Sequence, residues 1–401
     1  MPVSPAQASS QQRRLLLALG VSTFMVGLDG RIVSPLLPSI ARDFHTTLAV
    51  ASYSVSFYLL PYGLFQLGYG PLADRFGKVR VAAYAMLAFS AGTAACGAFA
   101  SLAALLALRA LTGAAAAALI PLTIAHIGDT VPYDRRQATL GLLMASSGAA
   151  QSLSTSAGGL LATWLSWRSI FPLLGGLSLL ATLWLLSESS RAARPTRDAA
   201  QERASYALAV RSSLGPLLVL VFAEGGLFMG VFPFLSGLLE ARFGSSPLEI
   251  GLVLGAAGLA QVLVARWLPR MVRHWGEERT VLIGASAMGV AYLCCAQASS
   301  PAWAAGAAAF LGVGFSTCHS TLQTRATEAF PRARGRALAL FAFSLFIGGG
   351  AGTFLMAWLC ETWGFGPSFA AAGAAFLCFA VLASRFVARE ELRLESAELS
   401  E

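Results

Sequence analysis

Long apolar segments alternate with short polar gaps along the whole chain. Most of these segments have about 20 residues, the length that an α-helix needs to cross the roughly 30 Å hydrocarbon core of a bilayer. They are continuous apolar runs, whereas a membrane β-barrel has alternating segments of about ten residues. The pattern therefore predicts an all-α membrane protein with twelve transmembrane helices. The predicted spans are 15–38, 49–70, 79–98, 102–127, 138–163, 169–187, 214–238, 248–268, 280–298, 302–324, 337–358 and 366–387.

The longest polar stretch separates the sixth predicted span from the seventh. Short patterns recur on its two sides: "DGRIVSPLLP" at 29–38 and "EGGLFMGVFP" at 224–233 both place a proline nine residues after an acid that precedes glycine. Such echoes suggest duplication. We therefore expect two pseudo-symmetric six-helix bundles. The predicted domains are an N-terminal bundle at 1–187, a cytoplasmic linker at 188–213, and a C-terminal bundle with a cytoplasmic tail at 214–401.

Composition and charge placement agree with this picture. Hydrophobic residues make up 56% of the chain and charged residues 12%, about half the charged fraction of a typical soluble protein. Of the 28 basic residues, 23 fall in gaps and tails on the side of the termini, and three, Arg42, Arg168 and Arg242, fall in gaps on the other side. By the positive-inside rule, both termini are expected to be cytoplasmic in a multi-pass protein of the inner membrane. The net charge of +8 then requires no nucleic acid partner.

A charged motif interrupts the apolar pattern between the second and third spans. It reads "GPLADRFGKVR" at 70–80, and the fourth span carries Arg109 four residues before Gly113. With two six-span halves, these features resemble the major facilitator superfamily, and within it the twelve-span drug:proton antiporter branch. The resemblance implies a major facilitator fold and a conformational latch at the motif. The latch residues would be Gly70, Asp74, Arg75, Gly77, Lys78 and Arg80.

In the family, the acid of this motif holds the two halves together on the inner side and stabilises the outward-facing state. The resemblance therefore gives that role to Asp74, with the start of the eleventh span at 332–341 as its partner. The alternative is a loop whose charges only fix topology, although acids contribute little to topology. The corresponding segment at 266–279 lacks an acid at the matching place, so we expect an asymmetric latch.

Ionisable residues inside a membrane are costly and mark functional sites by default. Asp29 and Arg109 are expected at matching depth in the first and fourth spans, where they could pair. An arginine that moves relative to a carboxylate changes how readily the carboxylate binds a proton, which is what proton coupling requires. Members of the family that exchange drugs for protons often carry this acid and this arginine. The alternative is a static structural pair. Arg31, on another helix face, is expected to extend outward.

Glu224 is the repeat counterpart of Asp29 in the seventh span, and the counterpart of Arg109 is Ala308. Glu224 is therefore expected to lack a basic partner, and to be a second proton site, a contact for a cationic substrate, or a neutral acid hydrogen-bonded between helices. His319 is expected to be a packing or hydrogen-bonding residue. Further residues are expected to line a substrate cavity. They are Gln66, Gln151, Gln261, Phe228 and Phe232.

These features predict a secondary active transporter that expels small hydrophobic or amphipathic compounds in exchange for protons. The alternatives are a sugar or metabolite carrier and, in another class, a membrane enzyme or receptor. Few polar residues lie in the spans, and the four histidines are dispersed, which disfavours both. No Walker-type loop is present and the cysteines lack metal-ligand spacing, so we expect no cofactor, metal or disulfide. The expected partners are a small-molecule substrate, protons and the lipid bilayer, and the expected state is a monomer.

One departure from the family concerns the fifth span. Antiporters of the family often carry a glycine-proline pair there, whereas this chain has Ser154 and Thr155. Because threonine does not break a helix as proline does, we expect a less kinked fifth span.

Overall fold

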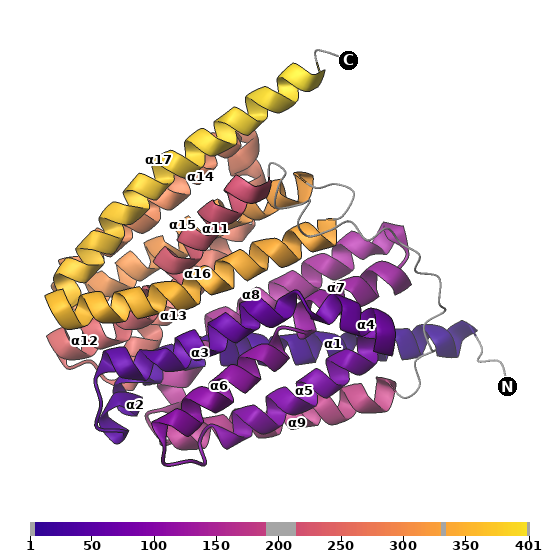
Figure 1. Ribbon diagram of the computed structural model, residues 1–401, viewed down its shortest axis with the longest axis horizontal. Coiled ribbons are helices and arrows are strands. Elements are labelled where there is room, and N and C mark those ends of the chain that lie inside the picture. The colour runs from indigo at the N-terminus through magenta and orange to yellow at the C-terminus, as the bar shows by residue number, and fades with distance from the viewer. Residues whose placement is uncertain (1–4, 190–213, 330–333, 399–401) are drawn as a thin grey trace.

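The computed structural model describes residues 5–189, 214–329 and 334–398, and these residues form helices joined by short turns (Figure 1). Nearly all of the predicted linker 188–213, and part of the predicted latch partner 332–341, lie outside the described residues. The helices up to residue 189 are α1 Pro5–Ile32, η1 Ser34–Leu36, α2 Leu37–Asp43, α3 Leu48–Gln66, α4 Tyr69–Phe76, α5 Lys78–Ala95, α6 Leu102–Ala116, α7 Leu119–Thr130, α8 Tyr133–Leu161 and α9 Trp167–Ser189. Those from residue 214 are α11 Leu214–Phe228, η2 Phe232–Phe234, α12 Leu235–Phe243, α13 Pro247–Ala265, α14 Leu268–Ala296, α15 Pro301–Glu328, α16 Arg334–Trp363 and α17 Phe365–Glu398.

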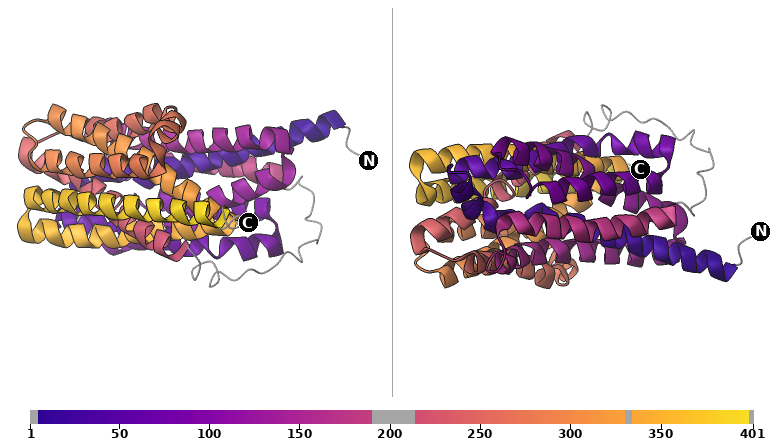
Figure 2. Two further views of the ribbon diagram at one scale, coloured as in Figure 1. Left: turned by 90° about the horizontal axis from the view of Figure 1, so that it is seen from above. Right: turned by 90° about the horizontal axis from the view of Figure 1, so that it is seen from below.

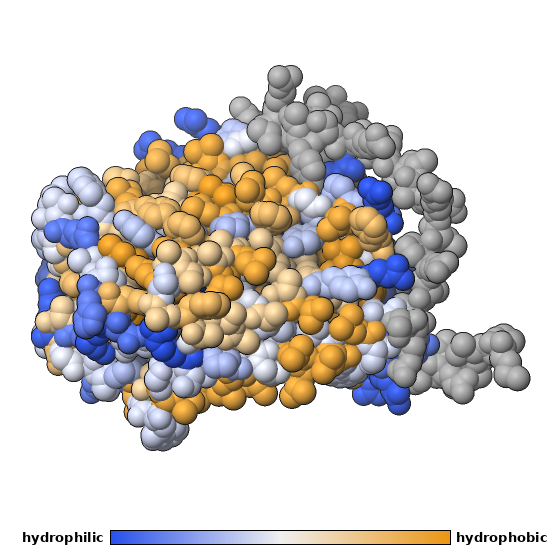
Figure 3. Space-filling view, turned by 60° about the horizontal axis from the view of Figure 1, so that its bottom comes forward, coloured by the Kyte–Doolittle hydropathy of each residue, from blue (hydrophilic) through white to orange (hydrophobic). Residues whose placement is uncertain are grey.

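Ten helical segments among the described residues are long and apolar enough to cross a membrane. The other two predicted spans, 79–98 and 138–163, are also helical, as α5 and α8. They are not among the ten because the 18 residues of α5 include Lys78 and Arg80, and α8 contains many serines and glycines. The number twelve therefore stays a prediction. Figure 3 shows a broad apolar band across the middle of the molecule, with hydrophilic residues toward its ends. Such a surface suits contact with lipid.

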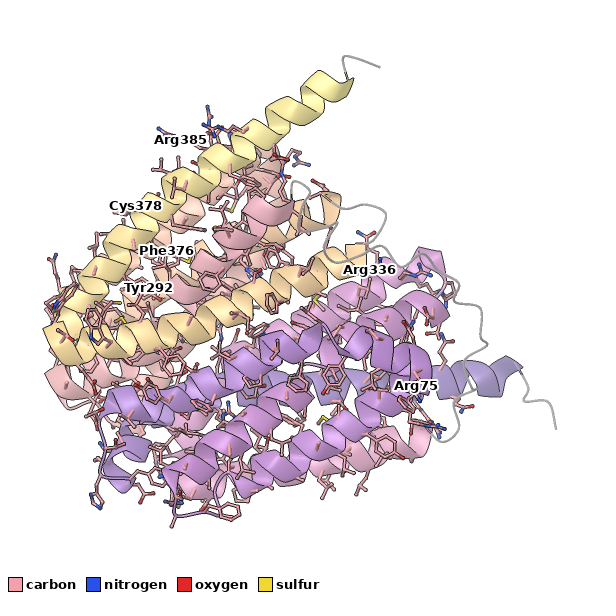
Figure 4. The ribbon with its side chains drawn as sticks, in the orientation of Figure 1. Arg75, Tyr292, Arg336, Phe376, Cys378 and Arg385 are labelled. Carbon is pink, nitrogen blue, oxygen red and sulfur yellow. The ribbon has the colours of Figure 1, made fainter. Side chains whose placement is uncertain are left out.

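Buried apolar side chains form two large clusters. One cluster draws on residues between Leu15 and Leu185, and the other on residues from Leu214 to Val387 together with Ala49 of α3. In the second cluster the ring of Tyr292 on α14 lies 5.8 Å from that of Phe376 on α17, and Figure 4 shows the two side by side. We keep the boundaries 1–187, 188–213 and 214–401 as a proposal that accounts for these clusters.

Three of the predicted spans are interrupted helices. The first consists of α1, η1 and α2, the fourth of α6 and α7, and the seventh of α11, η2 and α12. Each interruption has a proline, Pro35, Pro121 or Pro233, because proline lacks the N–H that would continue the helix and clashes with the carbonyl four residues earlier. In contrast, α8 runs unbroken through Thr155, and the smaller kink stays a prediction. The two interruptions nearest the acids follow Asp29 and Glu224 by a few residues.

The two parts of the chain meet near the end of the molecule that carries α2 and α12, which we call the opposite end. There α3 packs against α16, and α8 against α13. Ser56 on α3 donates a hydrogen bond to the Gly350 carbonyl (3.1 Å). Two side-chain contacts bridge the parts at this end: Arg42 pairs with Glu240, and Thr47 donates to Glu361 at 2.6 Å. We call these two contacts the opposite-end clasp.

Both termini lie at the other end, which we call the basic end (Figures 1 and 2). Toward the basic end, α14, α15 and α17 diverge from α1, α5 and α9 (Figure 1). The helices therefore make their closest contacts between the two parts toward the opposite end.

Glycine at the crossing of α8 and α13 leads to a first prediction. A methyl group added at Gly159 would lie 2.4 Å from the Pro247 carbonyl oxygen, whereas one added at Gly148 on the same helix meets nothing within 4 Å. Gly159→Ala should therefore destabilise the protein by about 1–3 kcal/mol through overpacking, and Gly148→Ala should be neutral or stabilising. Thermal unfolding in detergent measures both. A lower midpoint for Gly148→Ala than for Gly159→Ala would contradict the close approach.

Candidate functional site

The innermost charges of the first part of the chain form an ion pair. Nη1 of Arg109 on α6 donates to Oδ2 of Asp29 on α1 at 2.7 Å, and both side chains are at most 1% exposed. The guanidinium also lies 4.2 Å from the centre of the Tyr58 ring on α3. Oδ1 of Asp29 has no hydrogen-bond partner among the described residues. The arrangement thus leaves one buried carboxylate oxygen that can accept a proton or a hydrogen bond.

Glu224 has a partner that the sequence did not reveal. Its Oε2 lies 3.3 Å from Nδ1 of His319 on α15, so the expectation of an acid without a basic partner is wrong. The sequence repeat placed Ala308 at the position of a basic partner, but Glu224 and His319 pair because they lie at the same depth in their helices. Glu224 lies ten residues from the start of α11 and His319 nine residues from the end of α15, both counted from the basic end. Glu224 is fully buried, and its Oε1 has no partner among the described residues.

Two stacked rings extend this pair toward the middle of the molecule. Phe228 and Phe315 stack with their centres 4.0 Å apart, and Phe315 stacks on His319 at 4.6 Å. Phe228 follows Glu224 by four residues, and His319 follows Phe315 by four, so each pair shares one helix face. α11 and α15 therefore meet through an ionisable contact next to an aromatic one.

A cavity of about 80 Å³ lies between the two parts of the chain. Gln151, Phe228 and Phe232, which the sequence suggested, line this cavity, whereas Gln66 and Gln261 do not. Gln66 ends α3 toward the basic end and is buried, and the main-chain oxygen of Gln261 on α13 accepts a hydrogen bond from Ser316. The other lining residues are Val26, Gly27, Gly30, Arg31, Ser34, Val55, Tyr58, Leu59, Tyr62, Ile120, Ser147, Met229, Pro233 and Phe346.

Arg31 lies in this cavity lining and does not extend outward as expected. Its guanidinium carbon is 5.3 Å from the ring centre of Phe228 and 5.7 Å from that of Phe232. The sequence holds a signal for this orientation, because Gly27 and Ser34 share its helix face at spacings of four and three. A methyl group at Gly27 would lie 2.9 Å from Ala150 Cβ, so this face packs against α8.

The charged motif at 70–80 forms the short helix α4 and the start of α5. Gly77 between them has φ of 91°, a conformation that glycine adopts readily, and it allows the sharp turn. Asp74 is exposed and has no ion-pair partner among the described residues. Lys78 pairs with Asp129 of α7, so its charge is compensated within its own part of the chain. A methyl group at Gly70 meets nothing within 4 Å.

The basic end carries the remaining latch residues. Arg80 is exposed, and the guanidinium of Arg75 lies 5.1 Å from the ring centre of Phe76. Figure 4 shows Arg75 and Arg336, on α4 and α16, toward the end where the termini lie. The latch therefore stays a prediction. Among the described residues, Lys78 is the motif residue that forms an ion pair, and Asp74 has no ion-pair partner.

The corresponding segment of the second part keeps the turn and reverses the charges. Gly276 within α14 has φ of 77° and separates a short helical stretch from the long one. Glu277, directly after it, pairs with Arg325 of α15. Lys78 and Asp129 make the equivalent bridge with opposite polarity. The turn glycine is thus common to both parts, while the acid at the position of Asp74 is not.

Comparisons with known proteins identify the family of this chain. The chain is 25% identical to YwfA, an uncharacterised MFS-type transporter of Bacillus subtilis, over 93% of this chain and 90% of that protein. It is 25% identical to a chloramphenicol resistance protein of Pseudomonas aeruginosa, over 82% of this chain and 77% of that protein. The fold is similar to the crystal structure of a D-xylose–proton symporter, with a TM-score of 0.74, 16% identity, and coverage of 94% and 98%. The model of the Major Facilitator Superfamily matches residues 19–332 and 217–399. The chain therefore belongs to the Major Facilitator Superfamily.

Proposed function

We propose that this chain is a secondary active transporter that exports small hydrophobic or amphipathic compounds in exchange for protons. One observation carries the proposal: Asp29 and Glu224 are both buried beside interrupted helices, next to a cavity that both parts of the chain line. Each acid has one basic partner and one oxygen without a partner among the described residues. Transporters of this superfamily bind substrate near the membrane midplane, at interrupted helices. The chloramphenicol resistance protein among the relatives supports a drug-like substrate.

Proton binding would act through the pair of Asp29 and Arg109. A proton on Asp29 removes its negative charge and leaves the Arg109 charge buried without compensation, which is strongly unfavourable. The pair therefore separates or rearranges when Asp29 binds a proton, and α1 moves relative to α6. Tyr58 contacts the Arg109 guanidinium and also lines the cavity. A compound bound in the cavity would therefore contact Tyr58, which packs on the Arg109 guanidinium that pairs with Asp29.

Alternating access needs one end closed while the other is open. The closed opposite-end clasp and the divergence of the helices toward the basic end support an inward-facing state, if the basic end is cytoplasmic as we propose. The absence of an ion-pair partner for Asp74 among the described residues fits this state, because the proposed latch closes the basic end only in the outward-facing state.

A carrier of sugars or other metabolites is the second candidate, and the fold similarity to a D-xylose–proton symporter favours it. Sugar sites need several polar groups around the ligand. The polar residues of the cavity lining are Arg31, Ser34, Tyr58, Tyr62, Ser147 and Gln151, but most of the lining is aliphatic or aromatic. This lining suits an amphipathic compound better. Uptake into everted vesicles, with chloramphenicol and D-xylose compared with and without an imposed pH gradient, tests the two candidates directly.

A second prediction concerns proton coupling at Asp29. Asp29→Asn should abolish pH-driven accumulation of chloramphenicol in everted vesicles and the proton release that chloramphenicol causes in purified protein, because the amide keeps the shape but cannot titrate. Arg109→Ala should be at least as damaging. Glu328→Gln, which alters an exposed carboxylate at the end of α15, should leave both signals unchanged. Normal proton release from Asp29→Asn would remove Asp29 from the coupling mechanism.

A third prediction separates the role of Glu224 from that of Asp29. Glu224→Gln should change substrate preference, most for cationic compounds, if the residue contacts substrate, and His319→Gln should have a similar effect because it removes the partner of Glu224. The measurement is vesicle uptake of paired cationic and neutral compounds by each variant. If proton release disappears in Glu224→Gln and persists in Asp29→Asn, the two assignments must be exchanged.

A fourth prediction concerns the latch. Asp74→Asn should leave membrane insertion intact, lower transport, and bias the protein toward the inward-facing state by about threefold or more, because the outward-facing state loses a charge at a helix terminus. The readout is the reactivity toward an impermeant maleimide of a cysteine introduced by Ser39→Cys. Ser39 lines a second pocket, separate from the central cavity, at the opposite end beside Arg42 and Glu240. Reactivity should fall in Asp74→Asn and stay constant in Glu278→Gln. Unchanged reactivity and transport would return Asp74 to a topological role.

A further inference from the structure

Arg31 is a cavity residue whose charge has no carboxylate beside it. Asp29, two residues earlier, is bound to Arg109 on the other side of α1. Glu224, the other buried acid near the cavity, contacts His319. Among the described residues Arg31 forms no ion pair and no side-chain hydrogen bond. Its guanidinium lies over the rings of Phe228 and Phe232 and interacts electrostatically with Tyr292 of α14. A cationic group is therefore left in the cavity for something else to neutralise.

Leaving this charge uncompensated is costly, and proteins do so where a ligand completes the site. Arg31 is partly buried, and a charge removed from water normally has a partner, because transfer from water to an apolar medium is unfavourable. In membrane segments such residues face the interior and mark substrate pathways. The two rings at 5.3 and 5.7 Å offset part of the cost through their quadrupoles, but they do not neutralise the charge. An anion in the cavity would do so.

The surroundings of Arg31 also indicate what the rest of the ligand is. Phe228 and Phe232 lie against the guanidinium, and Leu59 and Phe346 belong to the same lining, so an apolar body has surfaces to contact. Gln151 and Ser34 add hydrogen-bonding groups close by. A planar guanidinium holds a carboxylate through two parallel hydrogen bonds, which fixes its orientation. The cavity therefore combines one cationic group with a wall of aromatic and aliphatic side chains.

We propose that Arg31 is an anion-binding residue of the central cavity, and that the compounds recognised there are amphipathic acids. The acid group lies against the Arg31 guanidinium, and the apolar body packs against Phe228 and Phe232. Arg31 belongs to α1, whereas both rings belong to the second part of the chain. A bound acid therefore contacts both parts at once. This inference deepens the proposed export function and rests on it for the claim that the ligand is transported.

The test uses two compounds that differ in charge and share their shape. The full-length protein in lipid nanodiscs is titrated with 1-naphthoate and 1-naphthamide, and binding is measured by calorimetry. We expect 1-naphthoate to bind about tenfold more tightly, as a charge-assisted hydrogen bond in a partly buried site implies. Arg31→Gln should abolish this preference and change 1-naphthamide binding by less than about twofold. Arg31→Lys should retain part of the preference, because it keeps the charge and loses the planar fork.

Reversing the charge at Arg31 gives a variant that should gain a new binding preference. Arg31→Glu should bind protonated 1-naphthylmethylamine more tightly than 1-naphthoate, whereas Arg266→Gln, which alters an exposed arginine on the helix-terminal turn after α13, should behave as the unmodified protein. Thermal unfolding of each variant shows whether it is folded. Equal binding of the two original compounds, binding of neither, or a preference that survives Arg31→Gln would overturn the assignment.

The failure of this inference is distinguishable from failure of the proposed function. If chloramphenicol accumulates in everted vesicles with a pH gradient but 1-naphthoate binding does not depend on Arg31, the export function stands and the anion site is overturned. If 1-naphthoate binding depends on Arg31 and no compound accumulates with the gradient, the anion site is supported and proton-coupled export fails.

Discussion

Two opposite charges without contact with solvent, on Asp29 and Arg109, impose the tightest constraint on this molecule. Removal of either charge alone is strongly unfavourable unless the pair rearranges, because the charge left behind would be buried without a partner. The pair therefore ties α1 to α6 for as long as Asp29 is ionised. Tyr58 packs on the guanidinium from α3, so three helices of the first part of the chain converge on one contact. The positions of the neighbouring cavity residues follow from this convergence.

The interrupted helices explain how such groups can be accommodated near the middle of an apolar protein. Prolines at 35 and 233 end the regular hydrogen-bonding shortly after the two acids, and the chain continues as η1 and η2. Each half of the sequence thus repeats an acid, a glycine and a proline in the same order. The repetition is not symmetric in its partners, since one acid meets an arginine and the other a histidine. This difference in partners is the reason for proposing that Asp29 couples protons and that Glu224 contacts substrate.

Much of the fold could be predicted from the sequence, because apolar runs of membrane length and proline positions are one-dimensional signals. The approach of Asp29 and Arg109 could also be predicted, since counting residues from the same end gives their depths. The contact of Glu224 with His319 was missed because the repeat offset pointed to Ala308, which lies eleven residues before His319 on the same helix. Counting residues from the basic end places Glu224 and His319 at matching depth. The orientation of Arg31 depended on which face of α1 packs against α8, and a charge two residues from Asp29 does not reveal this. Side-chain direction around a helix, not helix existence, limited the prediction of the site.

The opposite-end clasp makes this end of the protein sensitive to the ionic strength of the solution that it faces. Arg42 is 61% exposed and Glu240 is 32% exposed, so their attraction acts partly through water. Dissolved ions screen such a pair over a Debye length of about 8 Å at physiological ionic strength and about 3 Å at 1 M. An exposed pair contributes about 0.2–1 kcal/mol, which is enough to change the ratio of two conformations by up to about fivefold. The ionic strength on one side of the membrane thus becomes a variable that sets how much of the protein is closed on that side, independently of both substrate and protons.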